Sequence, residues 1–312
     1  MSLNYLVVRL LQILPTFFLI MIIAFVLVRL LPGDPTSALL GIKATDADVA
    51  NANARLGLDK PILVQFLYFL RNFFKGDLGD SIVLKVPVMS LILQRLPVTL
   101  LLSAFAGLLA LLLAVPLAFL AALNRDGRTD TVIRVLFQVG LSMPVFYLGL
   151  VLLGFFAVGL HWFPVGGFSD NLGSDLYHLF LPALTLALSL AAVLMRNLRN
   201  GIIEVLNADY VDFARAKGLR RHLVLGRHVL RNAAISTVAL FGLNIGTLIG
   251  GAVITESVFA IPGVGRLMID SIYGRDYPVI QGLTLALAIL VSLAFLVTDF
   301  VQASLDPRIA QR

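Results

Sequence analysis

Residues 196–231, RNLRNGIIEVLNADYVDFARAKGLRRHLVLGRHVLR, lie between two long apolar runs. This stretch carries eight basic side chains, and each would cost roughly 2.5–3.5 kcal/mol at the centre of a bilayer. Together they would cost on the order of 20 kcal/mol, so the stretch cannot cross a membrane. Because Lys and Arg concentrate on the cytoplasmic side of membrane proteins, we expect a polar cytoplasmic lobe here.

The composition of the whole chain indicates an integral membrane protein. Of its 312 residues, 59% are hydrophobic and 13% are charged, whereas soluble domains average about 45–50% apolar and about 25% charged residues. The net charge of +6 comes from basic clusters in loops, which indicates topology and contact with anionic lipid, not nucleic-acid binding. The absence of Cys excludes disulfides, thiolate metal sites and cysteine nucleophiles. The four His are scattered, so we expect no metal site.

Six apolar runs are long enough to cross the hydrocarbon core, which takes about 20 helical residues. All should be helical, since open strands cannot face lipid. The first run is too long for the apolar part of a signal peptide and lacks a small-x-small cleavage site, so we expect an uncleaved anchor. The predicted class is an all-α integral membrane protein with six transmembrane helices. They cover about residues 10–31, 96–123, 135–160, 179–195, 232–255 and 279–298.

The loops divide the chain into three predicted regions. Residues 1–94 form the anchor helix and a periplasmic loop subdomain, and residues 95–303 form the membrane domain, with a cytoplasmic loop at 196–231. Residues 304–312 form a tail. The basic bias of the inside loops predicts that both termini are cytoplasmic. Pro116, Pro144 and Pro182 lie in or near the runs and predict kinks.

The segment 61–74 of the outer loop has an amphipathic pattern. We expect it to lie in the membrane interface, because aromatic side chains anchor such helices at head-group level. Its expected anchors are Phe66, Tyr68, Phe69, Phe73 and Phe74.

The lobe is predicted to contain two short helices with a glycine elbow. Asn207 is a suitable N-cap, and Asp209 suits the positive end of the helix dipole. Gly218 follows Arg215 and Lys217, which is typical of a helix that ends with Gly in the left-handed conformation. The apolar stripe of the first helix must be buried, either on this chain's own membrane helices or in a soluble partner. That stripe is Ile203, Leu206, Tyr210, Phe213 and Ala214.

The sequence DFARAKG at 212–218 resembles the EAA-type cytoplasmic loop of ABC importer permeases, whose pattern is E-A-A-x3-G. Asp212 stands at the Glu position, Phe213 and Ala214 stand at the two Ala positions, and Gly218 stands at the Gly position. Further on, Leu230 matches the pattern, whereas the distal Ile and Pro positions hold His228 and Arg231 and depart from it.

A longer, ordered set of motifs resembles the B-type permease subunit of dipeptide, oligopeptide and nickel importers. The match extends over essentially the whole chain and is far more specific than the EAA-like segment alone. The motifs are PGDP (32–35), LGLDKP (56–61), GDLGDS (76–81), RLPVTL (95–100), DYVDFARAKGL (209–219), RHVLRNA (227–233), TESVFAIPGVGRL (255–267), RDYP (275–278) and LDPRI (305–309).

The resemblance implies a type I ABC importer permease fold, with a periplasmic subdomain after the first helix and a coupling helix between helices four and five. The chain would form half of a pore in the bacterial inner membrane for peptides, or for a related solute such as a nickel chelate or glutathione. The implied partners are a second, C-type permease, two cytoplasmic ATPase subunits, an extracytoplasmic solute-binding protein and the lipid bilayer. This chain has no G-x-x-x-x-G-K-[ST] phosphate loop, so we expect no enzymatic activity and no cofactor here, with ATP and Mg bound by the partners.

The predicted coupling site lies at the first lobe helix. Tyr210 and Phe213 would act as apolar plugs, Ala214 would permit close approach, and Gly218 would set the angle of the elbow. The whole set is Asp209, Tyr210, Asp212, Phe213, Ala214, Arg215, Lys217 and Gly218.

Two further sets of residues are candidates for packing and gating. Gly242, Gly246 and Gly250 recur every four residues, which predicts close helix packing or a smooth face along the pore. Asn244 should bond a neighbouring helix or line the pathway. The segment 259–267 is too rich in Pro and Gly to extend the fifth helix. The charges around it, Asp270 and Asp276 included, are either a gate or binding-protein contact or merely solvated. The candidate gate residues are Glu256, Pro262, Gly263 and Arg266.

An ion-coupled secondary transporter is the main alternative function. It would place ionisable groups near the bilayer midplane and show inverted repeats, whereas the six runs are nearly free of charge at their centres and we detect no repeat. An intramembrane enzyme would need a nucleophile and base or metal ligands within the runs, and the runs contain no such set.

Overall fold

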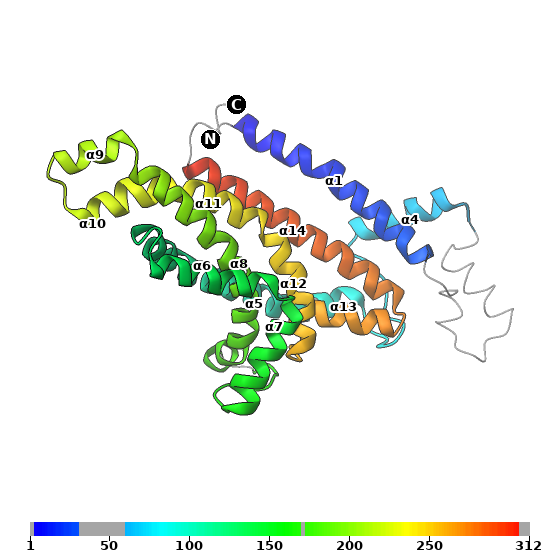
Figure 1. Cartoon of the computed structure of the whole chain (residues 1–312). Coiled ribbons are helices and arrows are strands. Elements are labelled where there is room, and N and C mark those ends of the chain that lie inside the picture. Colours follow the sequence, from blue (N-terminus) through cyan, green and yellow to red (C-terminus); the bar gives the residue numbers. More distant parts are fainter. Residues whose placement is uncertain (1–2, 31–59, 170–171, 306–312) are drawn as a thin grey trace.

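The computed structural model describes residues 3–30, 60–169 and 172–305, and its regular elements there are helices. Figure 1 shows an elongated bundle with α9 (Asp209–Ala216) and α10 (Arg221–Leu223) at one end and α13 (Val264–Tyr273) towards the other. The end that carries α9 is called the lobe end, and the opposite one the far end. PGDP, most of LGLDKP and all but the first residue of LDPRI lie outside the described residues.

Three helices are long and apolar enough to cross a membrane: α5 (Val88–Leu123), α8 (Leu172–Leu206) and α14 (Tyr277–Leu305). The number rises to five if each of two bent helix pairs is one span. The first predicted run lies in α1 (Leu3–Leu30), which packs beside α14 (Figure 1). The described residues therefore support three to five spans, and six remains the expectation from the sequence.

The third predicted span is not one straight helix. Its first half is α6 (Arg128–Ser142), and its second half is α7 (Val145–Leu152), which the π-helix η1 (Leu153–Gly159) continues. The chain bends by 109° between the two halves. Pro144 stands at the bend, where it forces the preceding residue into an extended conformation and offers no N–H to continue α6. The predicted kink at Pro144 is thus confirmed, whereas α5 and α8 continue as helices through Pro116 and Pro182.

The fifth predicted span is also broken. The chain bends by 46° between the helices α11 (Arg231–Leu243) and α12 (Ile245–Val258), with Asn244 between them. An apolar run reveals how much chain can cross a bilayer, but it does not reveal a bend within that run. This break separates Gly242 from the other two glycines of the predicted packing face.

The core lies mainly between α5 and α8, which make the most extensive helix–helix contact of the described chain. Both helices turn fully buried alanines towards the core at intervals of four residues, and small side chains at this spacing let two helix backbones approach closely. These two stripes were not among the packing faces predicted from the sequence. They are Ala106, Ala110, Ala114 and Ala118 of α5, and Ala183, Ala187 and Ala191 of α8.

The predicted lobe is partly a continuation of α8, which runs on to Leu206 before the chain turns. The helix α9 then begins at Asp209 after Ala208, and no side chain caps it. The predicted N-cap, Asn207, is therefore wrong by one residue. After α10, the π-helix η2 (Val224–Leu230) leads directly into α11.

The amphipathic segment of the outer loop forms a helix, α4 (Ile62–Phe74), as predicted. Its aromatic side chains are divided between two environments. Phe66 and Phe73 contact rings of α1, with centroids 5.1 Å from Phe25 and 5.7 Å from Phe17 respectively, while Tyr68 and Phe74 are exposed. Because Phe69 also contacts Phe25, three of the five expected interfacial anchors pack against α1.

Candidate functional site

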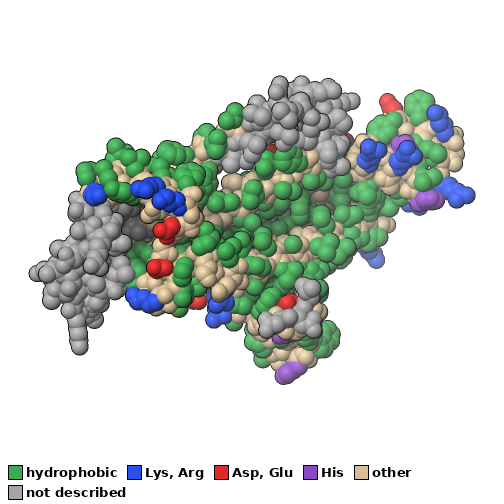
Figure 2. All heavy atoms as spheres, turned by 180° about the vertical axis from the view of Figure 1, so that it is seen from behind, with side chains coloured by type: hydrophobic (Ala, Val, Ile, Leu, Met, Phe, Trp, Pro, Cys, Tyr) green, Lys and Arg blue, Asp and Glu red, His purple; other side chains and the backbone are tan. Residues whose placement is uncertain are grey.

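The lobe helix α9 has an inner and an outer face. Val211 and Ala214 are buried in the main core, whereas Tyr210 and Phe213 have 44% and 69% of their surface exposed. The apolar residues were expected to pack either on this chain or on a soluble partner. The inner face packs on this chain, whereas the outer aromatic pair remains uncovered and available to a partner. Figure 2 shows basic and His side chains gathered on the lobe, at the right of that view, beside a largely hydrophobic body.

The elbow after α9 has the predicted backbone geometry. Gly218 adopts a φ of +73°, and its N–H donates to the Arg215 carbonyl at 2.9 Å. A Cβ at this position would meet no atom within 4 Å, so the requirement for Gly is conformational and not a matter of space. Any side chain other than Asn or Asp would therefore strain this turn.

The other predicted coupling residues lie around the outer face of α9. Arg215 Nη1 is 3.2 Å from Asp212 Oδ1, and both side chains are mostly exposed. Asp209 and Lys217 are exposed as well. Ala214 is the exception, because it faces the chain's own core and not the outer surface. Its position therefore does not allow Ala214 to contact a partner directly.

A buried ion pair joins the base of the lobe to α6. Arg199 of α8 donates from Nε to Asp130 Oδ1 at 2.7 Å and from Nη2 to Asp130 Oδ2 at 2.5 Å. Asp130 is fully buried and also accepts the Asp126 N–H at 3.0 Å. Sequence patterns do not predict this pair, because the local sign of it is merely an acidic residue in the first turn of a helix within an Arg-rich loop.

At the far end, the carboxylate of Glu256 caps α13. It accepts the Thr99 hydroxyl at 2.5 Å and the Arg266 N–H at 3.0 Å, and Thr99 itself accepts the Val264 N–H at 3.0 Å. The N–H groups of Val264 and Arg266 belong to the first turn of α13, where a helix lacks internal acceptors and favours negative charge. Glu256 is fully buried, so the interpretation of it as a solvated loop charge is wrong.

Gly263 and Gly265 lie so close to α12 that a side chain would not fit at either position. A Cβ on Gly263 would lie 2.2 Å from the Glu256 carboxyl carbon, and a Cβ on Gly265 would lie 2.3 Å from Val253 Cα. Arg266 Nη1 donates to the Ala260 carbonyl at 2.8 Å. The four predicted gate residues therefore lie around one connection: Glu256 is in the last turn of α12, Pro262 and Gly263 are in the loop, and Arg266 is in the first turn of α13.

A second buried carboxylate joins two motifs that are distant in the sequence. Asp276 of RDYP accepts the hydroxyl of Ser81, the last residue of GDLGDS, and the N–H groups of Ile82 and Val83 at 3.0 and 3.2 Å. Asp276 is only 2% exposed, so it too is not a solvated charge. This contact anchors the segment 81–83 to the start of α14, and spacing alone does not reveal it.

The glycines of the fifth run do not share one neighbour. A Cβ on Gly242 would lie 1.6 Å from Thr298 Cγ2 of α14, whereas a Cβ on Gly250 would meet nothing within 4 Å. A Cβ on Gly246 would lie at ordinary contact distance from Val291 and Phe295. The Asn244 amide donates to the Leu240 carbonyl at 2.8 Å, so among the described residues it does not make the expected bond to a neighbouring helix.

The helical bundle with its exposed lobe is the fold of a membrane permease, and the family comparison agrees. Residues 114–311 match the family of binding-protein-dependent transport system inner membrane components. Residues 2–103 match the N-terminal family of the same membrane components. This chain belongs to that family: it is a multi-pass inner-membrane permease of an ABC importer.

Curated relatives match over almost the full length of the chain. The oligopeptide transport system permease protein AppB of Bacillus subtilis is 40% identical over 311 residues, which is 98% of each chain. The glutathione transport system permease protein GsiC of Pectobacterium atrosepticum is 41% identical over 308 residues, with 98% of this chain and 99% of the relative covered. The di/tripeptide transport system permease protein DppB of Pseudomonas aeruginosa is 40% identical, with 98% of each covered.

Solved structures support the fold. An inward-facing structure of the MetNI methionine ABC transporter has a TM-score of 0.60 at 19% identity, with 70% of this chain and 97% of that chain covered. A chain of an amino acid ABC transporter crystallised with histidines has a TM-score of 0.51 at 15% identity, with 70% and 94% covered. Neither the relatives nor these structures support the ion-coupled alternative.

Proposed function

We propose that this chain forms half of the translocation pathway of an ATP-driven importer for short peptides. The three relatives described above are named for oligopeptides, glutathione and di/tripeptides, and glutathione is itself a tripeptide. Amino acids joined by amide bonds are therefore the chemistry that their solutes share. Nickel chelates remain an alternative solute that only the sequence resemblance implies.

The helix α9 is the proposed coupling helix, which would dock onto a cytoplasmic ATPase. The observation that carries this assignment is the exposure of Phe213 and Tyr210 on a short helix whose other face is locked into the core. Exposed aromatic side chains on a rigid support are typical energetic centres of interfaces. Because Val211 and Ala214 tie α9 to the membrane core, a displacement of the docked helix would move the bundle.

The orientation and the partners follow from this assignment. The lobe and both termini would be cytoplasmic, as the basic residues of the lobe favour. A second, C-type permease would complete the pore, and Gly250, which meets no neighbour within the described chain, is a candidate for that face. Two ATPase subunits would bind ATP and Mg, this chain would bind neither, and an extracytoplasmic solute-binding protein would meet the turn 256–266.

The coupling assignment is tested by Phe213→Ala in the complete transporter. We expect co-purification of the ATPase subunits and uptake of a labelled dipeptide to fall about ten-fold or more, because an interface anchor would be lost. The matched control is Phe74→Ala, since Phe74 of α4 is similarly exposed at 75% but lies outside the lobe. Equal uptake by wild type and Phe213→Ala would refute the assignment.

Orientation and solute are tested separately. The chain contains no Cys, so an Arg215→Cys variant gives one label site in this subunit. A membrane-impermeant maleimide should label it in inverted vesicles and not in intact cells; the reverse pattern would overturn the proposed topology. Competition of dipeptide uptake by tripeptides, glutathione and a nickel chelate would then rank the solutes, and inhibition by the chelate alone would contradict the peptide assignment.

A further inference from the structure

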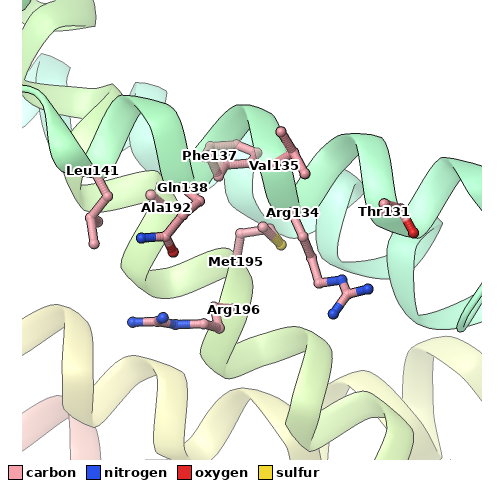
Figure 3. A pocket seen from close by; sticks show the side chains of 9 residues that line it. All are labelled: Thr131, Arg134, Val135, Phe137, Gln138, Leu141, Ala192, Met195 and Arg196. Carbon is pink, nitrogen blue, oxygen red and sulfur yellow. The ribbon is translucent and has the colours of Figure 1, made fainter.

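A groove of about 400 Å³ lies between α6 and α8, on a part of the surface that neither the coupling helix nor the far-end turn uses. This volume is within the range of small-molecule sites. Its wall is mainly apolar, with Val135, Leu141 and Met195 among the contributing side chains (Figure 3). Two arginines, Arg134 from α6 and Arg196 from α8, extend on either side of Met195.

The charge of this groove is not balanced by the residues that line it. No Asp or Glu belongs to the lining. Arg134 Nε lies 3.4 Å from Asp130 Oδ1, but both oxygens of that carboxylate already accept hydrogen bonds from Arg199. Arg196 is exposed and makes no hydrogen bond or ion pair within the part of the chain that the structure describes. The groove is therefore suited to an anionic group.

The surroundings of the groove are hydrocarbon-like. Because Arg196 directly follows the apolar run 179–195, we expect its guanidinium where the hydrocarbon core gives way to the head groups. Next to the groove, α6 exposes a row of apolar side chains. They are Val132, Val135, Leu136 and Val139, each with 50–67% of its surface exposed.

We propose that this groove binds an anionic phospholipid such as phosphatidylglycerol. The phosphate lies between Arg134 and Arg196, and an acyl chain runs along the exposed valines of α6. A phosphate supplies the charge that the two arginines lack, and basic pockets between membrane helices recognise such head groups. The bound lipid holds α6 against α8 beside the Asp130–Arg199 pair. The proposal is independent of which solute the transporter carries.

Lipid contact is tested on the complete transporter in nanodiscs with a fluorophore at position 135. A Val135→Cys variant in this Cys-free chain is labelled with bimane, and the complex without the variant corrects for cysteines of the partners. Brominated phosphatidylglycerol should quench bimane at lower lipid fractions than brominated phosphatidylcholine. Equal quenching by the two lipids would overturn the proposal, and so would an absence of quenching by either, which indicates that a second permease subunit covers the groove.

The role of the arginines is tested by charge-matched double variants. Arg134→Gln with Arg196→Gln should raise the phosphatidylglycerol fraction needed for half-maximal quenching, roughly five-fold for each arginine removed. The control is Arg125→Gln with Arg128→Gln, which removes two charges at the same end but outside the groove. Equal weakening in both double variants would refute a specific site. The comparison of the two lipids on the arginine-intact protein decides the question if the double variant does not assemble.

Discussion

The clearest prediction for stability concerns the Asp130–Arg199 pair, because a single substitution leaves a buried charge without its counter-ion. Asp130→Asn keeps the size of the side chain but removes its charge. It leaves the guanidinium of Arg199, whose side chain is 10% exposed, with one acceptor oxygen at position 130 in place of two, beside the Asn200 Oδ1 that its Nη1 already meets at 3.2 Å. Removal of one partner from a buried ion pair costs about 3–5 kcal/mol. We expect about 3 kcal/mol here, because the pair lies near the helix ends, where the long Arg199 side chain can reach towards water.

That loss corresponds to a fall in Tm of roughly 5–10 °C for a chain of this size. The assay is thermal unfolding of the purified transporter, followed by the loss of its monodisperse peak in size-exclusion chromatography. The control is Arg125→Gln, which removes only the 3.3 Å contact with Asp126, between side chains that are 57% and 77% exposed. We expect this control to change the stability by less than about 1 kcal/mol.

A double variant distinguishes a stranded charge from lost packing. Asp130→Asn combined with Arg199→Gln removes both charges, so most of the stability lost in the single variant should return. The reasoning is refuted if Asp130→Asn unfolds at the wild-type temperature, or if the double variant is less stable than the single one.

Three further predictions, each with its own control variant, concern other contacts. Gly218→Val should uncouple ATP hydrolysis from uptake while the protein stays in the membrane, because Val does not tolerate the left-handed φ of +73°; Gly218→Asn should retain more coupling, and unchanged coupling in the Val variant would contradict this. Asp276→Ala removes the acceptor of three hydrogen bonds and should make the loop after Ser81 sensitive to protease added at the far end, unlike Asp270→Ala at an exposed position. Gly242→Leu should lower the Tm of the complex, since its Cβ alone would collide with Thr298, whereas Gly250→Ala should leave the Tm unchanged unless the second permease packs there.

Much of the secondary structure could be predicted because it depends on local properties. The apolar runs, the amphipathic segment at 61–74 and the left-handed Gly218 follow from side-chain transfer energies and backbone conformational preferences. The same local rules failed at Asn207, where the chain leaves one more residue outside the helix and uses no side-chain cap. They also gave no angle for the bends at Pro144 and Asn244, which depend on how each half-helix packs on its neighbours.

The buried carboxylates show where pattern reasoning stopped. A charged residue in a loop is ordinarily expected to be exposed, so the sequence allowed Glu256 to be interpreted as a solvated group. Its burial becomes acceptable only because Thr99, from a helix more than 150 residues earlier, and the first turn of α13 together supply donors. No property of the 255–267 segment by itself reveals the Thr99 contribution.

For this protein, composition and motif order alone established a helical permease with a polar lobe, because the energy of placing charge in hydrocarbon depends on residue type and hardly on the fold. Tertiary structure alone decided which polar groups are paired and which aromatic side chains are left uncovered. Asp130, Glu256 and Asp276 each meet donors from distant segments, whereas Phe213 remains 69% exposed on the same short helix that buries Val211. The physical reason is that hydrogen bonds and close packing act over a few ångströms, so they depend on the spatial contacts that only the folded chain creates.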